Sequence, residues 1–395
     1  MTSLTAQFIQ RYGESDEPIR QFFAPGRVNL IGDHIDYNGG LVFPCAINHG
    51  TTLLIRKSND NTVKLASLNF DLMAVLSESE TERKYGDHWI NYPLGVLQQY
   101  RQSAIDMTGV ECLYSGNLPS AAGLSSSAAI EVATAYALNE IHKTGLDLVE
   151  IACLSRRAEN EFVGVQCGIM DQYAVCMGQE NHAMKLNCQT LQHEQIPLNL
   201  GDYRILLVNT NQRRELSESK YNERVIETQK ALSLMQSVSD AKQLADVSLK
   251  ALEAHQDLFT YYPTHFKRAR HVVTEQARVI QAVQALKLGD LRKFGDLMYQ
   301  SHDSLALDYG VSSEPLNLLV DITRDNPSVI GSRLTGAGFG GCTVNLIEQS
   351  HIDQFTEEVG QQYLSATGLT ATFLPIDPSQ GVHEQDAGII EEFVA

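Results

Sequence analysis

The chain has 395 residues, of which 43% are hydrophobic and 20% are charged, and Asp and Glu (48) outnumber Lys and Arg (30) to give a net charge of −18. This length predicts two or three domain equivalents with enough apolar material for sizeable cores. Because basic patches supply the affinity for nucleic acid and for anionic membranes, the charge excludes both as nonspecific partners. No apolar run approaches the ~20 residues that span a bilayer, and the N-terminus lacks the basic start and apolar core of a signal peptide.

Seven cysteines are spread along the sequence, and none forms a CxxC pair. This pattern indicates neither a disulfide framework nor a zinc knuckle. We therefore expect a soluble, reduced, cytoplasmic globular protein that is an enzyme or a small-molecule binder.

The first half of the chain mixes strand-like and helix-like segments. Short stretches rich in β-branched residues predict strands at residues 51–56, 62–68 and 110–115. A continuous Ala-rich apolar pattern without Pro predicts a buried helix at residues 125–143, and a one-sided apolar pattern predicts a second helix at residues 148–163. The remaining strand-like segments of this half are residues 183–188 and 203–210.

The second half is mostly helical. From residue 217 the helical pattern continues for over a hundred residues, with breaks near Tyr262 and Gly310, before strand-like segments return at residues 342–348 and 370–375. Strands and helices are mixed without strict alternation, which favours an α+β fold over a doubly wound parallel sheet.

The change of pattern near residues 190–200 is the best candidate for a domain boundary. It predicts an N-terminal domain at residues 1–195 and a C-terminal domain at residues 196–395. The last forty residues are an exception, since they are compatible with a return to the first domain.

A first Gly-rich segment, residues 24–40, contains the polar cluster Arg27, Asp33, His34 and Asp36. Loops present side chains to ligands, so a charged cluster on a Gly-rich turn is a candidate polar site. The alternative is a solvated surface turn.

A second segment, residues 119–129, places three serines directly before the predicted helix. Backbone N–H groups at a helix N-terminus form an anion cradle, and serine hydroxyls add donors and a possible Mg²⁺ ligand. The alternative is a plain serine N-cap. The segment is not a Walker A loop, because the chain contains no Gly-Lys pair.

Two further segments complete the set of candidates. Residues 336–341 match GxGxxG but lead into a strand instead of a helix, which rejects dinucleotide binding and favours a Gly-rich hairpin or loop over a ligand. Asp171, in the segment CGIMDQ, follows two apolar residues and is a candidate base or charge stabiliser. Its alternative role is to cap a helix that begins at Gln172.

Together these segments resemble the galactokinase family, a branch of the GHMP small-molecule kinases. The matching motifs are GRVNLIGDHIDY, PSAAGLSSSAA, CGIMDQ and LTGAGFGG, and they occur in the family's order between about residues 23 and 348. The resemblance implies a two-domain α+β architecture with the active site in the cleft between the domains. It also implies transfer of the ATP γ-phosphoryl group to the C1 hydroxyl of α-D-galactose.

The resemblance also implies roles for individual residues. Asp171 would be the catalytic aspartate, with Arg27 close to both Asp171 and the transferred phosphate. The residues implied for the sugar are Asp33, His34, Asp36, Gly168 and Tyr221. Those implied for ATP are Trp89, Tyr92, Pro119, Ser120, Ala121, Ala122, Gly123, Leu124, Ser125, Ser126, Ser127, Ala128 and Ala129. Ser127 and Glu159 would contact Mg²⁺.

Two alternative functions remain open at this point. Many relatives have Glu at the position of Asp33 and Thr at the position of Ile35, so a kinase for a related sugar such as N-acetylgalactosamine is one alternative. The other is a non-catalytic galactose and ATP sensor, although the intact segment GLSSSAA, Asp171 and Arg27 favour an enzyme. We expect a monomer that binds neither nucleic acid nor membrane.

Overall fold

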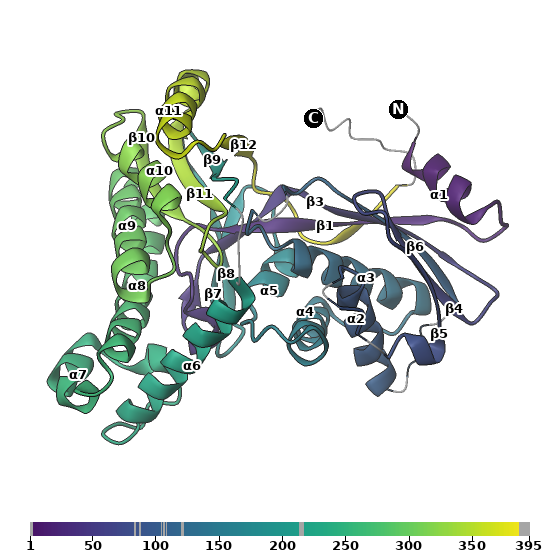
Figure 1. Cartoon of the computed structure of the whole chain (residues 1–395), viewed down its shortest axis with the longest axis horizontal. Helices are drawn as coiled ribbons and strands as arrows, with labels where there is room; N and C mark the ends of the chain where they lie inside the picture. The colour runs from purple at the N-terminus through teal and green to yellow at the C-terminus, as the bar shows by residue number, and fades with distance from the viewer. Residues whose placement is uncertain are drawn as a thin grey trace.

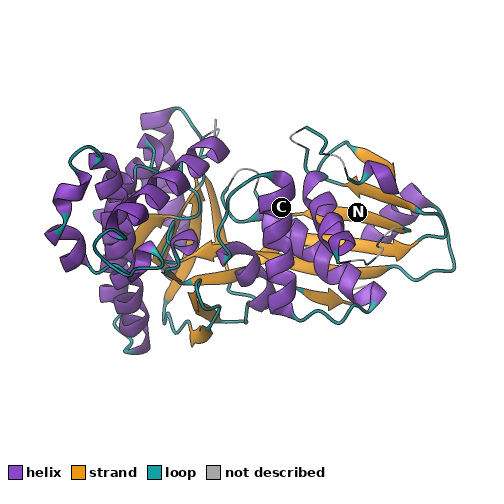
Figure 2. Cartoon of the chain, turned by 90° about the horizontal axis from the view of Figure 1, so that it is seen from below, coloured by secondary structure: helices purple, strands orange, loops and turns teal. Residues whose placement is uncertain are grey.

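The computed structural model describes residues 3–386, except residues 83, 87, 104, 106, 108, 120, 121 and 213–216. Within these residues the strands form three sheets that are covered by helices (Figures 1 and 2), which confirms the predicted α+β class. None of the described helices is long and apolar enough to cross a membrane.

The largest sheet has the strand order β13-β1-β3-β6-β4-β5 and is antiparallel except for the pair β4 and β6. Helices α2 to α5 lie together under one face of this sheet, and α1 packs on the opposite face (Figure 1). The strands are β1 (Arg20–Asn29), β3 (Pro44–Lys57), β4 (Thr62–Ser67), β5 (Met73–Ser77), β6 (Val110–Gly116) and β13 (His383–Gln385). The helices are α1 (Leu4–Tyr12), α2 (Asn91–Gln102), α3 (Ser126–His142), α4 (Leu148–Arg157) and α5 (Met170–Met177).

A second sheet, in the order β10-β11-β9-β12, organises the other end of the molecule. Helices α10 and α11 share an apolar cluster with one face of this sheet, and α9 packs closely on β10. The strands are β9 (Tyr203–Asn209), β10 (Val329–Leu334), β11 (Cys342–Glu348) and β12 (Thr372–Ile376). The helices are α6 (Ser217–Met235), α7 (Leu249–Ala254), α8 (Pro263–Lys287), α9 (Leu291–Ser304), α10 (Glu314–Arg324) and α11 (Ile352–Thr367).

A small third sheet connects the two ends. It contains β2 (Leu41–Val42), β7 (His182–Asn187) and β8 (His193–Pro197) in the order β2-β7-β8. Strand β8 runs across the position predicted as the domain boundary, so the chain has no linker there.

Each predicted strand overlaps an observed one, and the two predicted helices are α3 and α4. Helix α4 continues as a π-helical turn, η3 (Ala158–Val163), that ends at Gly164. The main difference is β1, which the sequence reading treated as part of a Gly-rich turn. The segment pairs with β3 on both sides of a register shift between Pro25 and Arg27, so a β-bulge accommodates the Pro-Gly pair within the strand.

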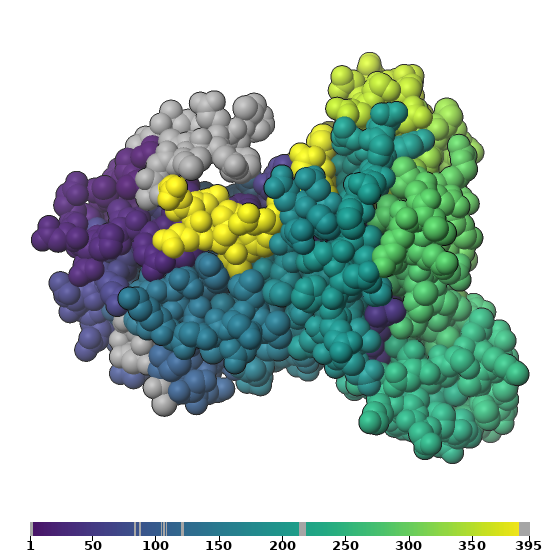
Figure 3. All heavy atoms as spheres, turned by 180° about the vertical axis from the view of Figure 1, so that it is seen from behind, coloured from purple at the N-terminus to yellow at the C-terminus, as the bar shows by residue number. Residues whose placement is uncertain are grey.

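The end of the chain returns to the largest sheet. After β12, Pro378 bridges to Ile47, and β13 then pairs antiparallel with β1. Figure 3 shows this segment in yellow, lying across the N-terminal half of the chain.

Helix α9 approaches β10 at Gly295. A Cβ atom at this position would lie 1.8 Å from the backbone oxygen of Ile330. We expect Gly295→Ala to lower the free energy of unfolding by about 1–3 kcal/mol or more, because the helix must move away from the strand. Urea denaturation measures this change.

The matched control is Gly360, a glycine inside α11. A Cβ atom there meets only ordinary contacts, the nearest being Phe373 Cε2 at 3.5 Å. Gly360→Ala is expected to raise the stability by about 0.5–1 kcal/mol. Similar effects of the two substitutions would contradict the close packing of α9 on β10.

Candidate active site

A cavity of about 210 Å³ lies between the two ends of the molecule. Residues from the N-terminal half form most of its wall, and Tyr221, Gly336 and Ala337 come from the C-terminal half. The predicted site residues that line it are Arg27, Asp33, His34, Asp36, Pro119, Ala122, Gly123, Leu124, Ser125, Ser126, Ser127, Glu159, Gly168, Asp171 and Tyr221. The structure therefore brings together segments that are far apart in sequence.

An ion pair between Arg27 on β1 and Asp171 on α5 lies in the wall of the cavity. Arg27 donates from Nε to Oδ1 and from Nη2 to Oδ2 of Asp171, both at 2.8 Å, and from Nη1 to the backbone oxygen of Gly123 at 2.8 Å. The side chain of Arg27 is only 4% exposed, against 28% for Asp171. The buried guanidinium thus fixes the orientation of a carboxylate whose surface is still open to the cavity.

The Gly-Ser loop (residues 122–127) passes directly over this ion pair and leads into α3. Ser125 has φ +62°, and its hydroxyl donates to Oδ2 of Asp171 at 2.6 Å. The first N–H groups of a helix lack intrahelical partners, so the start of α3 offers donors and a positive dipole end to an anion. Ala128 and Ala129 are buried behind this loop, whereas Ser120 and Ala121 lie outside the described residues.

The Gly-rich loop between β10 and β11 closes the cavity from the other side, as the hairpin prediction required. Gly336 has φ +77°, and a Cβ atom there would lie 2.6 Å from the backbone oxygen of Gly123. Only glycine allows the two loops to approach this closely.

Asp36 begins a short 3₁₀ turn, η1 (Asp36–Asn38), and is buried beside Gly168. A Cβ atom at residue 168 would lie 2.0 Å from Oδ2 of Asp36, so this glycine leaves room for the carboxylate. Burial and the nearby charge of Asp171 raise the pKa of Asp36 to about 7. A ligand that donates hydrogen bonds to this carboxylate would relieve the cost of its burial.

His34 is held as a neutral imidazole. Burial and the neighbouring His271 lower the pKa of His34 to about 3. Nε2 lies 3.1 Å from the backbone oxygen of Ala337, which can only accept, so Nε2 carries the proton. Nδ1 then accepts from the Tyr37 hydroxyl at 2.9 Å, and the ring of Tyr221 packs 5.5 Å from the imidazole.

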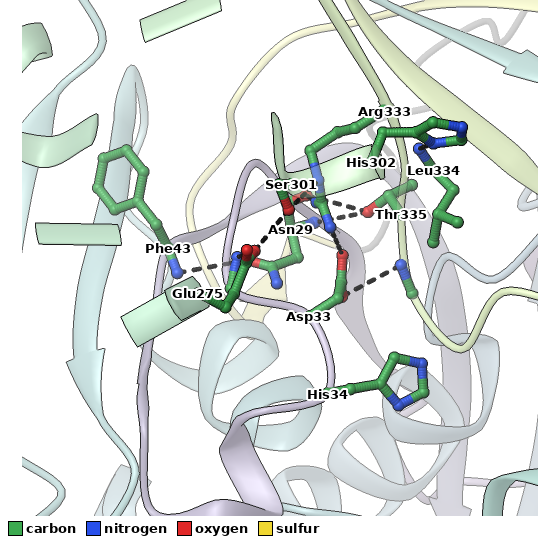
Figure 4. A network of polar contacts seen from close by, with 12 residues as sticks. Asn29, Asp33, His34, Phe43, Glu275, Ser301, His302, Arg333, Leu334 and Thr335 are labelled. Carbon is green, nitrogen blue, oxygen red and sulfur yellow. Dashed lines mark hydrogen bonds and ion pairs between the residues drawn. The ribbon is translucent and has the colours of Figure 1, made fainter. Parts of the chain in front are cut away.

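Asp33 connects the two ends of the molecule through a buried network (Figure 4). Its Oδ2 lies 2.6 Å from Nη2 of Arg333, with both side chains at 1% exposure or less. Its Oδ1 accepts from the backbone N–H of Gly336 at 3.2 Å. Arg333 also donates to the backbone oxygen of Asn29 at 2.9 Å. The network ties the first Gly-rich segment to the third.

Arg333 is a residue that the sequence reading missed. It is a fully buried charge within the otherwise uncharged strand β10. A single Arg inside such a strand is a signal, since buried charges are almost always paired.

Glu159, on η3, lies beside Ser127 and the cavity. Ser127 and Glu159 line the same cavity, and Gln172 Nε2 donates to Oε2 of Glu159 at 2.6 Å. Burial and the charge of Asp171 raise the pKa of Glu159 to about 7.

The donor set of Ser127 and Glu159 fits Mg²⁺. This ion prefers hard oxygen ligands and is usually held by one or two protein groups together with substrate phosphates and water. The described residues contain no group of three or more His, Cys, Asp or Glu that could hold a metal ion by themselves.

Trp89 and Tyr92 lie at the start of α2 and do not line the cavity. Trp89 is 8% exposed and packs edge-on against Tyr114, with ring centroids 5.3 Å apart. Their proposed contact with adenine stays a prediction.

Cys167 lines the cavity but is not poised as a nucleophile. Burial and the charge of Glu159 raise the pKa of its thiol, and Sγ lies 3.1 Å from Oδ1 of Asn160. A protonated thiol in this setting is a packing and hydrogen-bonding group.

Known proteins resemble this chain in sequence and in fold. A family model described as the galactokinase galactose-binding signature matches residues 6–57, and models of the GHMP kinase N-terminal and C-terminal domains match residues 91–179 and 282–365. A galactokinase from Clostridium tetani is 43% identical over 97% of both chains, and one from Bacillus subtilis is 41% identical over 95% of this chain and 97% of its own.

Among solved structures, Lactococcus lactis galactokinase complexed with galactose superposes with a TM-score of 0.94 at 39% identity, covering 97% of this chain and 99% of that one. Methanococcus jannaschii mevalonate kinase shares the fold, with a TM-score of 0.65 at 20% identity over 93% of this chain and all of its own. The fold is therefore that of the GHMP class of small-molecule kinases. Within that class, the chain belongs to the galactokinase family.

The raised pKa of Asp36 predicts a pH-dependent cost of folding. Its folded pKa of about 7 lies above the ordinary value of 3.8, so its contribution is most favourable at low pH and is lost as the pH rises through about 7. We expect the melting temperature of Asp36→Asn to rise relative to that of the wild type as the pH is raised from about 5 to about 8. Thermal unfolding across this pH range measures the difference.

Other buried carboxyl groups titrate in both proteins and cancel in this comparison. Asp353→Asn, at an exposed position on α11, is the control and should follow the wild-type curve. If the melting temperatures of Asp36→Asn and the wild type change with pH in parallel, ionisation of Asp36 does not destabilise the folded protein.

Proposed function

We propose that this chain transfers the γ-phosphoryl group of ATP to the C1 hydroxyl of α-D-galactose, giving α-D-galactose 1-phosphate and ADP. The observation that carries the proposal is the position of Asp171. Arg27 orients its carboxylate in a cavity that also contains the Gly-Ser loop and the polar cluster of the first Gly-rich segment.

Phosphoryl transfer depends on alignment and on neutralisation of charge more than on covalent help from the protein. Asp171 accepts the proton of the sugar's C1 hydroxyl as the oxygen attacks phosphorus. Arg27 keeps this carboxylate ionised and oriented, and its charge offsets negative charge on the transferring group. The N–H groups at the start of α3 hold the phosphates.

The sugar hydroxyls are bound on the opposite side of Asp171. Asp36 and Asp33 accept hydrogen bonds, neutral His34 keeps a fixed tautomer, and Gly168 and Tyr221 complete the wall. Ser127 and Glu159 would hold Mg²⁺, which, when bound, neutralises charge on the β- and γ-phosphates.

Ile35 does not favour an alternative sugar. Its side chain is fully buried, packs against Gly40 and lies outside the lining of the cavity. Ile35 is therefore not expected to contact a sugar in this cavity.

We further propose that the enzyme acts as a monomer in the cytoplasm.

Removal of the Asp171 carboxylate tests the mechanism. We expect Asp171→Ala and the isosteric Asp171→Asn to lower kcat by at least about 10²–10⁴-fold, the usual contribution of a general base, while ATP binding persists. Assays with galactose and Mg-ATP, together with calorimetry of ATP binding, measure both effects. Asp353→Ala is the control with full activity, and nearly full kcat in either Asp171 variant would exclude the assignment.

Trp89 is the only tryptophan of the chain. If its ring lies against adenine, saturating ATP will change its fluorescence, and the same concentration of inorganic triphosphate will not. An unchanged emission spectrum on saturation with ATP would argue against Trp89 as an adenine contact.

A further inference from the structure

Behind the Gly-Ser loop, two buried carboxyl groups converge on a single amide. Gln172 Nε2 donates to Oε2 of Glu159 at 2.6 Å and to Oε2 of Glu131 at 3.0 Å. Gln172 and Glu131 are fully buried, and Glu159 is 6% exposed. The three side chains come from α5, α3 and η3, so the contact joins three separate elements.

Only one member of this group reaches the cavity. Glu159 lines it, whereas Glu131 and Gln172 are absent from its wall. Glu131 is therefore not placed to contact a ligand in the cavity itself, and it reaches the cavity through its neighbours. A fully buried Glu within the Ala-rich helix α3 is costly unless it is hydrogen-bonded, and Gln172 supplies that bond.

The chemistry of the bridging group is informative. Gln172 is a neutral donor, so it orients the Glu159 carboxylate without cancelling its charge. A Lys or Arg here would form an ion pair and compete with a cation for the same oxygens. The neutral amide thus adds no positive charge that would compete with a cation for the oxygens of Glu159.

The position of Gln172 adds a second constraint. It directly follows Asp171 on α5, so one turn of helix carries both the carboxylate held by Arg27 and the amide that holds Glu159. The hydrogen bond from Gln172 to Glu131 holds this turn of α5 in place. It thereby fixes the distance between the carboxyl groups of Asp171 and Glu159.

From this geometry we propose that Glu131 and Gln172 are positioning residues that orient Glu159 toward the divalent cation of bound Mg-ATP. The inference rests on the proposed function, in which Glu159 contacts the metal. Partners that hydrogen-bond a metal ligand typically change metal affinity by about 10–100-fold when they are removed.

The test measures metal affinity directly. Electron paramagnetic resonance titrates Mn²⁺ into the full-length protein saturated with a non-hydrolysable ATP analogue. We expect Glu131→Leu and Gln172→Leu to weaken Mn²⁺ binding by about 10–100-fold and to leave galactose binding, measured by calorimetry, close to that of the wild type. Glu131→Gln retains an acceptor oxygen for Gln172 and should rescue the affinity.

A purely structural role predicts a different pattern. Glu111 on β6 is a buried carboxylate of the largest sheet, paired with Arg56 and Lys64 away from the cavity. Glu111→Gln should lower the melting temperature without changing Mn²⁺ affinity. Folded Leu variants at residues 131 and 172 that bind Mn²⁺ as tightly as the wild type would overturn the proposal.

Two further variants keep the test decisive. If the Leu variants do not fold, Gln172→Asn retains the amide but shortens its reach by one methylene, and wild-type Mn²⁺ affinity in that variant would also overturn the proposal. Glu159→Gln tests the proposed metal contact of Glu159 separately from the positioning roles of Glu131 and Gln172. If it binds Mn²⁺ like the wild type, the metal contact in the proposed function is wrong, whatever the result at Glu131.

Discussion

The pairing of Arg27 with Asp171 is the interaction on which the site depends. A guanidinium that is 4% exposed needs a charged partner and several acceptors, and here Asp171 and the backbone oxygen of Gly123 provide them. These bonds fix three segments relative to each other, namely β1, the start of α5 and the Gly-Ser loop. Ser125 adds a further bond to the same carboxylate. The geometry of the cavity is therefore set by a requirement of folding, the neutralisation of a buried charge.

The same pairing limits what Arg27 contributes to the attraction of a polyanion. Three of its nitrogen atoms already donate to Asp171 and Gly123, and the chain as a whole carries a net charge of −18. The favourable potential for a triphosphate must come from local sources, which are the start of α3 and the metal ion that accompanies the nucleotide. The side chains that line the cavity do not supply this potential, since they include four carboxyl groups and one guanidinium.

Much of the fold could be predicted from local sequence patterns, but the connections within the site could not. The strands at β4, β6 and β11 and the helix α3 follow from composition and periodicity, because these segments are regular and buried. The glycine and serine motifs identified most of the residues that line the cavity. Arg333 was missed because its partner Asp33 lies 300 residues earlier in the chain, and the roles of Glu131 and Gln172 depend on three elements meeting in space. The sequence predicts a turn where β1 lies, because the bulge at Pro25 and Gly26 interrupts the alternation of side chains that is typical of a strand.

The return of the chain end to β1 has a consequence for synthesis. Strand β1 carries Arg27, and its outer edge is closed only by β13, which contains some of the last described residues. Until those residues leave the ribosome, the strand that holds the central guanidinium has an open edge, and open edges invite pairing with other chains. The order of translation therefore leaves this edge of the sheet exposed to aggregation while the residues between β1 and β13 are made.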